Sequence, residues 1–362
     1  MNPYYPNLLS PIKIGNVTLK NRICVAPMNL REVDHNGGYT ARTIAFNEKF
    51  AKGGVALITM GETCVSPRTG SSESFMLRIT NPGAYFSLCD LAETVHRWGA
   101  KISMEMSHAG ALCIPENNFG NQPMGPIDYV KPSGVAVRAM TLSDMEEVAE
   151  DFGNAALTLK NAGFDMVQFH AGHGWLIHQF LSPRTNKRTD EFGGSLENRM
   201  RFPLMVLERV RQKVGKNMLI EIQWSADDLE GGYTLEESAA FLNEAKKYID
   251  IVQLRANEVD HAHPIGFELE ETPFLKFGEY MKKNVPGLVI GVIGGFHYPA
   301  TCDKAIAEGK ADIIYAARAY ISNNDYGQLV LEGRDDDIVP CLRCNKCHGR
   351  GANDPFVSVC SV

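Results

Sequence analysis

Four of the nine cysteines in this chain lie close together near its end, at Cys341, Cys344, Cys347 and Cys360. Their spacing is C-x2-C-x2-C-x12-C. Four thiolates can bind zinc or a [4Fe–4S] cluster, and the spacing alone leaves both open. In a reducing compartment, clustered cysteines bind metal more often than they form disulfides. The other five cysteines are scattered, which is typical of small buried hydrophobic residues.

Two histidines, His170 and His173, follow a short apolar run. This spacing, just beyond a strand, can point both imidazoles into one pocket. As metal ligands they lack a third partner at recognisable spacing, whereas as neutral donors to a carbonyl or phenolate oxygen they make chemical sense. The alternative is a pair of structural loop histidines, and His178 further along is expected to be structural.

Gly294, Gly295 and Arg318 fall at the ends of the last two expected strands. They would offer bare backbone amides, a following helix N-terminus and one guanidinium, which together suit a phosphate group. The alternative for Arg318 is a surface ion pair.

Short apolar runs and longer amphipathic stretches alternate along the chain and must position these residues. Eight apolar runs, each followed by helical material, predict an α/β fold in which a parallel sheet closes into a (β/α)8 barrel. The rival, an open doubly wound sheet, would want a Gly-x-Gly-x-x-Gly turn, which the sequence lacks. The expected strands span residues 22–27, 54–61, 101–106, 165–170, 218–224, 250–255, 288–294 and 311–317.

Two helices and a hairpin have clear boundary signals. Residues 142–164 have helical periodicity, with Ser143 as the expected N-cap and Gly163 as the stop, and residues 234–248 do the same after a threonine cap. Gly15-Asn16 separates two short alternating runs, which predicts a β-hairpin that caps the barrel floor.

The composition argues against several classes of partner. The net charge is −7 and the pI is about 5.8, which disfavours a surface for nucleic acid or anionic membranes. No run approaches the roughly 18 apolar residues of a membrane span. The N-terminus lacks the basic and apolar regions of a signal peptide. We therefore expect a cytoplasmic protein with neither nucleic-acid nor membrane partners.

Three stretches together carry a resemblance: “LKNRICVAPM”, “HAGHGWLIHQFLSPRTNKRTDEFGGSLENRMRF” and the terminal cysteine run. They resemble the Old Yellow Enzyme-like NADH:flavin oxidoreductase family. The closer resemblance is to its iron–sulfur branch, which includes 2,4-dienoyl-CoA reductase, enoate reductases, bile-acid enone reductases and trimethylamine dehydrogenase. The resemblance covers nearly the whole chain, and the stretch from Ser182 to Arg201 is long and specific.

The resemblance implies a barrel that binds FMN without a covalent bond. Glu105 stands where many relatives have a glutamine on the pyrimidine side of the flavin, and a glutamate there resembles the amine-dehydrogenase branch. His170 and His173 match the pair that binds the substrate oxygen above the flavin. The other residues matched to the FMN site are Ala26, Pro27 and Met28 under the ring, Gly61 at its edge, and Gly294, Gly295, Ala317 and Arg318 at the phosphate.

Three positions depart from the family pattern. Gln223 stands where most relatives have an arginine beside the flavin, so the charge that stabilises the reduced flavin is missing there. Trp175 stands where many relatives have a tyrosine that donates a proton, and indole cannot do so. Asn29 replaces the cysteine that tethers FMN in trimethylamine dehydrogenase.

The resemblance also implies a [4Fe–4S] cluster at the four terminal cysteines, whose spacing equals that of trimethylamine dehydrogenase. We expect residues 1–335 to form the FMN-binding barrel and residues 336–362 to form a cluster-binding segment at its side. In the relatives, a second half that binds FAD or ADP and NAD(P)H follows. We therefore expect this chain to be a fragment of a longer protein, and the alternative is a separate reductase partner.

The expected activity is reduction of an activated C=C bond in an enone, enoate or enoyl thioester, with electrons from NAD(P)H passing through the cluster to FMN. His261 and His263, in the segment 255–267 that should line the substrate pocket, are candidates for the acid that Trp175 cannot be. The alternative is that both are loop residues exposed to water. One alternative is an amine dehydrogenase, although trimethylamine-type sites have a tyrosine at the position of His170. Another is an electron-transfer module without its own substrate. Self-association into a homo-oligomer is compatible with the sequence.

Overall fold

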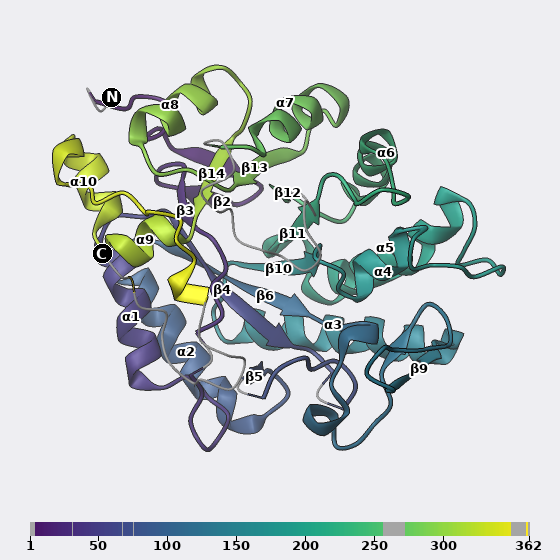
Figure 1. Ribbon diagram of the computed structural model, residues 1–362. Helices are drawn as coiled ribbons and strands as arrows, with labels where there is room; N and C mark the ends of the chain where they lie inside the picture. Colours follow the sequence, from purple (N-terminus) through teal and green to yellow (C-terminus); the bar gives the residue numbers. More distant parts are fainter. Residues whose placement is uncertain are drawn as a thin grey trace.

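A closed barrel of parallel strands forms the centre of the molecule (Figure 1). The structure is a computed structural model that describes residues 4–30, 32–66, 68–74, 76–255, 272–348 and 360. Within these residues, β3 pairs with both β14 and β4 and thereby closes the sheet, which confirms the expected (β/α)8 fold. The barrel strands, in chain order, are β3 (Ile23–Val25), β4 (Leu57–Cys64), β6 (Lys101–Ser107), β10 (Met166–Ala171), β11 (Leu219–Ser225), β12 (Ile251–Arg255), β13 (Val289–Ile293) and β14 (Ile313–Ala316).

Helices surround the barrel, and each barrel strand is followed by at least one of them (Figure 1). None of the helices in the described part of the chain is long and apolar enough to cross a membrane. The α-helices are α1 (Ala41–Lys52), α2 (Pro82–His96), α3 (Leu142–Asn161), α4 (Leu176–Leu181), α5 (Leu196–Val214), α6 (Leu235–Ala245), α7 (Leu275–Asn284), α8 (Pro299–Ala307), α9 (Arg318–Ser322) and α10 (Tyr326–Glu332). Short 3-10 helices are η1 (Gly110–Leu112), η2 (Pro115–Asn118), η3 (Gly215–Asn217), η4 (Asp335–Asp337) and η5 (Lys346–His348).

The N-cap of α3 differs from the expected one. Thr141, and not Ser143, caps the helix, because its hydroxyl accepts from the backbone N–H of Asp144 while the Asp144 carboxylate accepts from the Thr141 N–H. This reciprocal capping box outcompetes the serine two residues later. Thr234 caps α6 in the same way, as the sequence predicts.

The floor of the barrel is closed by the predicted hairpin of β1 (Ile12–Ile14) and β2 (Val17–Leu19). Gly15 has a φ of +54°, which the tight turn requires and which glycine adopts at little cost. Ile14, Val17 and Leu19 are buried against residues at the amino ends of the barrel strands, including Leu57 and Leu219. The opposite, carboxyl rim is therefore the open end.

Strand β4 begins and ends three residues later than predicted. Its pairing with β6 shifts register between Met60 and Thr63, so the strand continues through a bulge at Gly61 and Glu62. A Cβ atom on Gly61 would lie 2.1 Å from the carbonyl carbon of Met28. The close packing of the bulge against the backbone of Met28 therefore requires glycine at position 61, whether or not a ligand is bound.

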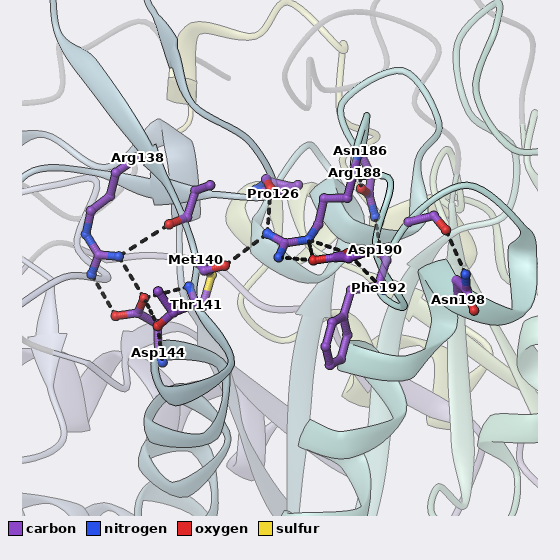
Figure 2. A network of polar contacts seen from close by, with 12 residues as sticks. Pro126, Arg138, Met140, Thr141, Asp144, Asn186, Arg188, Asp190, Phe192 and Asn198 are labelled. Atoms are coloured by element: carbon purple, nitrogen blue, oxygen red, sulfur yellow. Dashed lines mark hydrogen bonds and ion pairs between the residues drawn. The ribbon is translucent and has the colours of Figure 1, made fainter.

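A small sheet of β7 (Met124–Gly125), β8 (Tyr129–Val130) and β9 (Ala136–Ala139) follows β6 and precedes α3 in the chain, and β5 (Leu77–Arg78) pairs in parallel with the end of β4. Arg188 ties this region to the loop before α5, because its Nη1 donates to the carbonyls of Pro126 and Met140 at 2.8 and 2.9 Å (Figure 2). Asn186 holds the same loop by donating to the carbonyls of Phe180 and Phe192. Arg188 and Asn186, both in the stretch from Ser182 to Arg201, thus hold the chain on either side of α4 in place.

The barrel interior contains a carboxyl group, that of Glu221 on β11, with 0% exposure. Burial raises the pKa of Glu221 to about 7, although Tyr315 and Gln168 beside it lower the pKa in part. Because the pKa in the folded chain exceeds the unfolded value, the unfolded state binds fewer protons between these two values. Stability therefore falls as the pH rises from about 4.5 to about 7.

We predict that Glu221→Gln removes this part of the pH dependence. The wild-type free energy of unfolding should fall by about 3 kcal/mol across that window, since each unit of pKa shift is worth about 1.4 kcal/mol. Urea unfolding of both proteins at about pH 5 and about pH 8 measures the difference. An equal pH dependence in the two proteins would contradict the prediction.

Candidate active site

A cavity of about 460 Å³ opens at the carboxyl ends of the barrel strands. Barrel topology brings side chains from distant parts of the sequence to this rim. Its wall includes residues of β6, β10, β11, β12, β13 and β14. The predicted site residues that line it are Pro27, Asn29, Glu105, His170, His173, Trp175, Gln223, Gly294, Gly295, Ala317 and Arg318.

Three of the predicted residues are not on this wall: Ala26, Met28 and Gly61. Ala26 is fully buried, and its N–H donates to the carbonyl of Ala316 at 2.9 Å, which holds the end of β3 beside β14. Met28 and Gly61 contact each other behind the wall. His263 lies outside the described residues, so its predicted role as an acid stays a prediction.

The two predicted histidines contact each other. His173 Nδ1 lies 3.1 Å from His170 Nε2, and both side chains are buried. His173 has a φ of +55°, a strained conformation for a residue other than glycine. Its N–H donates to Ser225 Oγ at 3.4 Å, so the last residue of β11 helps to hold the loop that carries the histidine.

Burial lowers the pKa of His170 well below its usual value, and the nearby Arg255 and His178 lower it further. His170 is therefore neutral at neutral pH. A neutral imidazole carries one N–H, so His170 can donate to a substrate oxygen only if its Nε2 accepts from His173 Nδ1 in the bond between the rings.

Glu105 and Gln223 form a second buried pair, in which Gln223 Nε2 donates to Glu105 Oε1 at 2.8 Å. Burial raises the pKa of Glu105 well above its usual value, Glu62 and Glu221 raise it further, and Arg255 opposes them. These effects favour the protonated, neutral carboxyl. Gln223 Oε1 has no hydrogen-bond partner within the described residues, so it is an acceptor for a ligand.

Arg255, the last residue of β12, is a residue of this cavity that the sequence analysis does not single out. Burial lowers its pKa to about 10, so the guanidinium remains charged at neutral pH. In the segment that begins with Arg255, the predicted residues are instead His261 and His263, which lie outside the described residues. The rule that chemistry lies at strand ends would have found Arg255 if strand six had been treated like the others.

The opposite part of the cavity has the character of an anion site. Gly294 and Gly295 have φ values of +116° and +75°, and a Cβ atom on Gly295 would lie 2.6 Å from the backbone nitrogen of Thr272. Arg318 lines the cavity beside them. His297, which the sequence analysis also misses, is buried there, and neither of its ring nitrogens has a partner in the described part of the chain. Burial lowers its pKa to about 4, and Arg318 and Arg343 contribute.

The four terminal cysteines line one small cavity of about 20 Å³ together with Arg318 and Asn345. Arg318 Nη1 donates to Asn345 Oδ1 at 2.7 Å. Arg343 and Asn345 have φ values of +54° and +57°, so the backbone reverses between the cysteines. Among the described residues, no group of three or more His, Cys, Asp or Glu side chains is already arranged to hold a metal. The metal therefore stays a prediction.

The residues on the cavity wall fit FMN. Buried polar atoms without a partner are costly, so they indicate a polar ligand. Such atoms occur in two parts of this cavity: the ring nitrogens of His297, close in sequence to the glycines, and Gln223 Oε1 and Arg255 Nε on the adjacent strands β11 and β12. An elongated molecule with a phosphate at one end and a hydrogen-bonding ring at the other satisfies both sets.

A second cavity, of about 430 Å³, lies beside the first and shares His173 with it. Its lining includes the apolar residues Leu112, Ile127 and Leu229 and, among charged residues, Arg184. A molecule in this cavity can therefore reach the histidine pair.

Comparison with known proteins agrees with this geometry. The model of the NADH:flavin oxidoreductase / NADH oxidase family matches residues 7–337. The chain is 36% identical to an NADH oxidase from Thermoanaerobacter brockii over 94% of its length, and 32% identical to a cinnamate reductase from Clostridium sporogenes over 100% of it. These alignments cover 53% and 58% of the relatives, so the chain spans little more than half their length.

Two solved structures share the fold. A 2-naphthoyl-CoA reductase in complex with 2-naphthoyl-CoA superposes on 94% of this chain and 54% of its own, with a TM-score of 0.88 and 29% identity. A histamine dehydrogenase from Rhizobium sp. 4-9 superposes on 99% of this chain and 52% of its own, with a TM-score of 0.86 and 27% identity. The chain thus belongs to the NADH:flavin oxidoreductase / NADH oxidase family of flavin-dependent oxidoreductases.

Proposed function

We propose that this chain is the FMN-binding and substrate-reducing part of a cytoplasmic reductase that acts on an activated C=C bond. The observation that carries the proposal is the buried His170–His173 pair on the wall of the FMN cavity. A neutral imidazole donor suits the carbonyl oxygen of an enone, enoate or enoyl thioester. The similarity to proteins named cinnamate reductase and 2-naphthoyl-CoA reductase supports this class of substrate.

FMN would supply the hydride that adds to the β-carbon of the double bond. The histidine pair binds the carbonyl oxygen, on which negative charge develops, and its N–H stabilises that charge in a site largely shielded from water. Trp175 packs beside the pair, with its ring centroid 5.4 Å from that of His170, and helps to orient it. Because an indole N–H does not transfer protons at neutral pH, the proton for the α-carbon comes from another group or from water.

The rest of the substrate is proposed to occupy the second cavity. This cavity shares His173 with the FMN cavity, and much of its lining is apolar. A substrate held by its carbonyl oxygen at the histidine pair can therefore extend an apolar group into it. The volume of about 430 Å³ suits a substituent larger than those of the smallest enones.

For the electron supply, we propose that residues 336–362 hold a [4Fe–4S] cluster through Cys341, Cys344, Cys347 and Cys360. The spacing of the cysteines and the small cavity that they share support this. Arg318 lines both that cavity and the FMN cavity, so the two sites are adjacent. NAD(P)H would deliver electrons through an FAD-containing region of the same polypeptide or through a separate reductase.

Amine oxidation is the second candidate function, because the chain resembles a histamine dehydrogenase in structure over 99% of its length. We predict that, after anaerobic reduction, an enone or aryl acrylate reoxidises the bound FMN, whereas amines do not bleach the oxidised form. Stopped-flow absorbance of the flavin measures both reactions. Bleaching by an amine without reoxidation by any unsaturated carbonyl compound would establish the oxidative reaction instead.

We predict that His173→Ala slows reoxidation of reduced FMN by a competent enone at least about tenfold, or about 1.4 kcal/mol of transition-state stabilisation. The physical reason is the loss of the N–H that binds the substrate oxygen. His96→Ala is the matched control, since His96 pairs with Asp165 near the start of β6, away from the cavity. A wild-type rate in His173→Ala would refute the assigned role.

We predict that the chain, reconstituted anaerobically with iron and sulfide, contains about four of each per polypeptide, and that Cys347→Ala loses them. All four thiolates, including that of Cys347, are needed because the loss of one ligand exposes an iron. Cys89→Ala, which changes a cysteine on α2, is the control. Stoichiometric zinc without acid-labile sulfide in the wild-type chain would show a zinc site in place of a cluster.

A further inference from the structure

Arg255 is a cation that forms no ion pair with any other described residue. Its Nε is buried and has no hydrogen-bond partner in the described part of the chain. An unpaired charge in a poorly solvated site is costly, so such residues are normally balanced by a counter-charge. Because Arg255 lines the FMN cavity, the missing negative charge belongs to whatever the cavity binds.

Arg255 ends β12, which pairs with β11 on one side and with β13, the strand that precedes the glycines, on the other. Glu105 and Arg318 both act on its charge. Glu105 accepts a hydrogen bond from Gln223, and within the described residues it makes no ion pair with Arg255. The register pairs Ser225 of β11 with Arg255 of β12, two residues beyond Gln223 towards the rim.

We propose that Arg255 stabilises the negative charge that the FMN ring gains on reduction, and thereby sets the reduction potential of the bound cofactor. The inference rests on the proposed function only in taking FMN as the ligand. Two electrons and one proton leave the ring with one additional negative charge. A guanidinium fixed in a site of low polarity stabilises such a charge without reorganisation, whereas the neutral Gln223 cannot.

The test uses Arg255→Gln in the full chain, reconstituted with FMN. The dissociation constant for oxidised FMN is measured by fluorescence, and the midpoint potential by anaerobic equilibration with a reference dye. The preference for reduced over oxidised FMN should fall at least about tenfold, which for a two-electron couple shifts the midpoint by about 30 mV to more negative values. Arg201→Gln, an exposed arginine on α5, is the control and should leave the potential unchanged.

Two further variants separate charge from shape. Arg255→Lys keeps the positive charge and should keep the preference within about threefold of the wild type. The double variant with Arg255→Gln and Gln223→Arg moves the charge to the neighbouring strand and should restore part of the preference. If Arg255→Gln folds but does not bind FMN, the proposal is tested with Arg255→Lys instead. A tenfold loss of the preference for reduced over oxidised FMN in Arg255→Lys would overturn the proposal.

Two other outcomes would overturn the proposal, each for a different reason. If Arg255 binds the phosphate, Arg255→Gln weakens oxidised and reduced FMN equally and leaves the midpoint unchanged, which overturns the inference. The same variant would then bind riboflavin, which lacks the phosphate, as well as the wild type does. If the wild-type chain fails to bind FMN in either redox state, the proposed function fails, and the inference fails with it.

Discussion

The hydrogen-bonded contacts of β3 with both β14 and β4 are the constraint on which the rest of the molecule depends. This strand has only three residues, yet without it the parallel sheet would remain open and its two edges would lie apart. Once the sheet is closed, the carboxyl ends of β6, β10, β11 and β12 face the same space as those of β13 and β14. The glycines, the histidine pair and Arg255, which are distant in sequence, then share one cavity.

The most specific stretch of the sequence acts mainly away from the reacting atoms. Arg188 Nη1 and Asn186 Nδ2 donate to backbone carbonyls, and Arg199 donates to the carbonyls of Leu181 and Gly194 at 2.8 and 2.6 Å. These bonds fix α4 and the loops beside it. Since α4 follows the loop that carries His173, the brace limits how far the histidine pair can move. The stretch that is most specific to the family therefore stabilises the position of the site.

The sequence predicted the architecture well because buried parallel strands are continuous apolar runs and because Gly15 and Thr234 have unambiguous local roles. It failed where two local signals competed, as at Thr141 and Ser143, or where a bulge displaced the strand end at Gly61. The two histidines were found, but their mutual hydrogen bond depends on the strained backbone at His173 and could not be read from spacing. His297 was missed because only the three-dimensional cavity reveals that its ring nitrogens lack partners among the described residues, whereas Arg255 stands at a strand end, where the sequence could have revealed it.

The bond from Arg318 to Asn345 joins the cofactor cavity to the cysteine segment through one guanidinium. Two ligands that share such a side chain are thermodynamically linked, so each changes the affinity of the other by the same factor. A change in the cysteine segment that displaces Asn345 would therefore also release the Arg318 guanidinium, which lines the cofactor cavity.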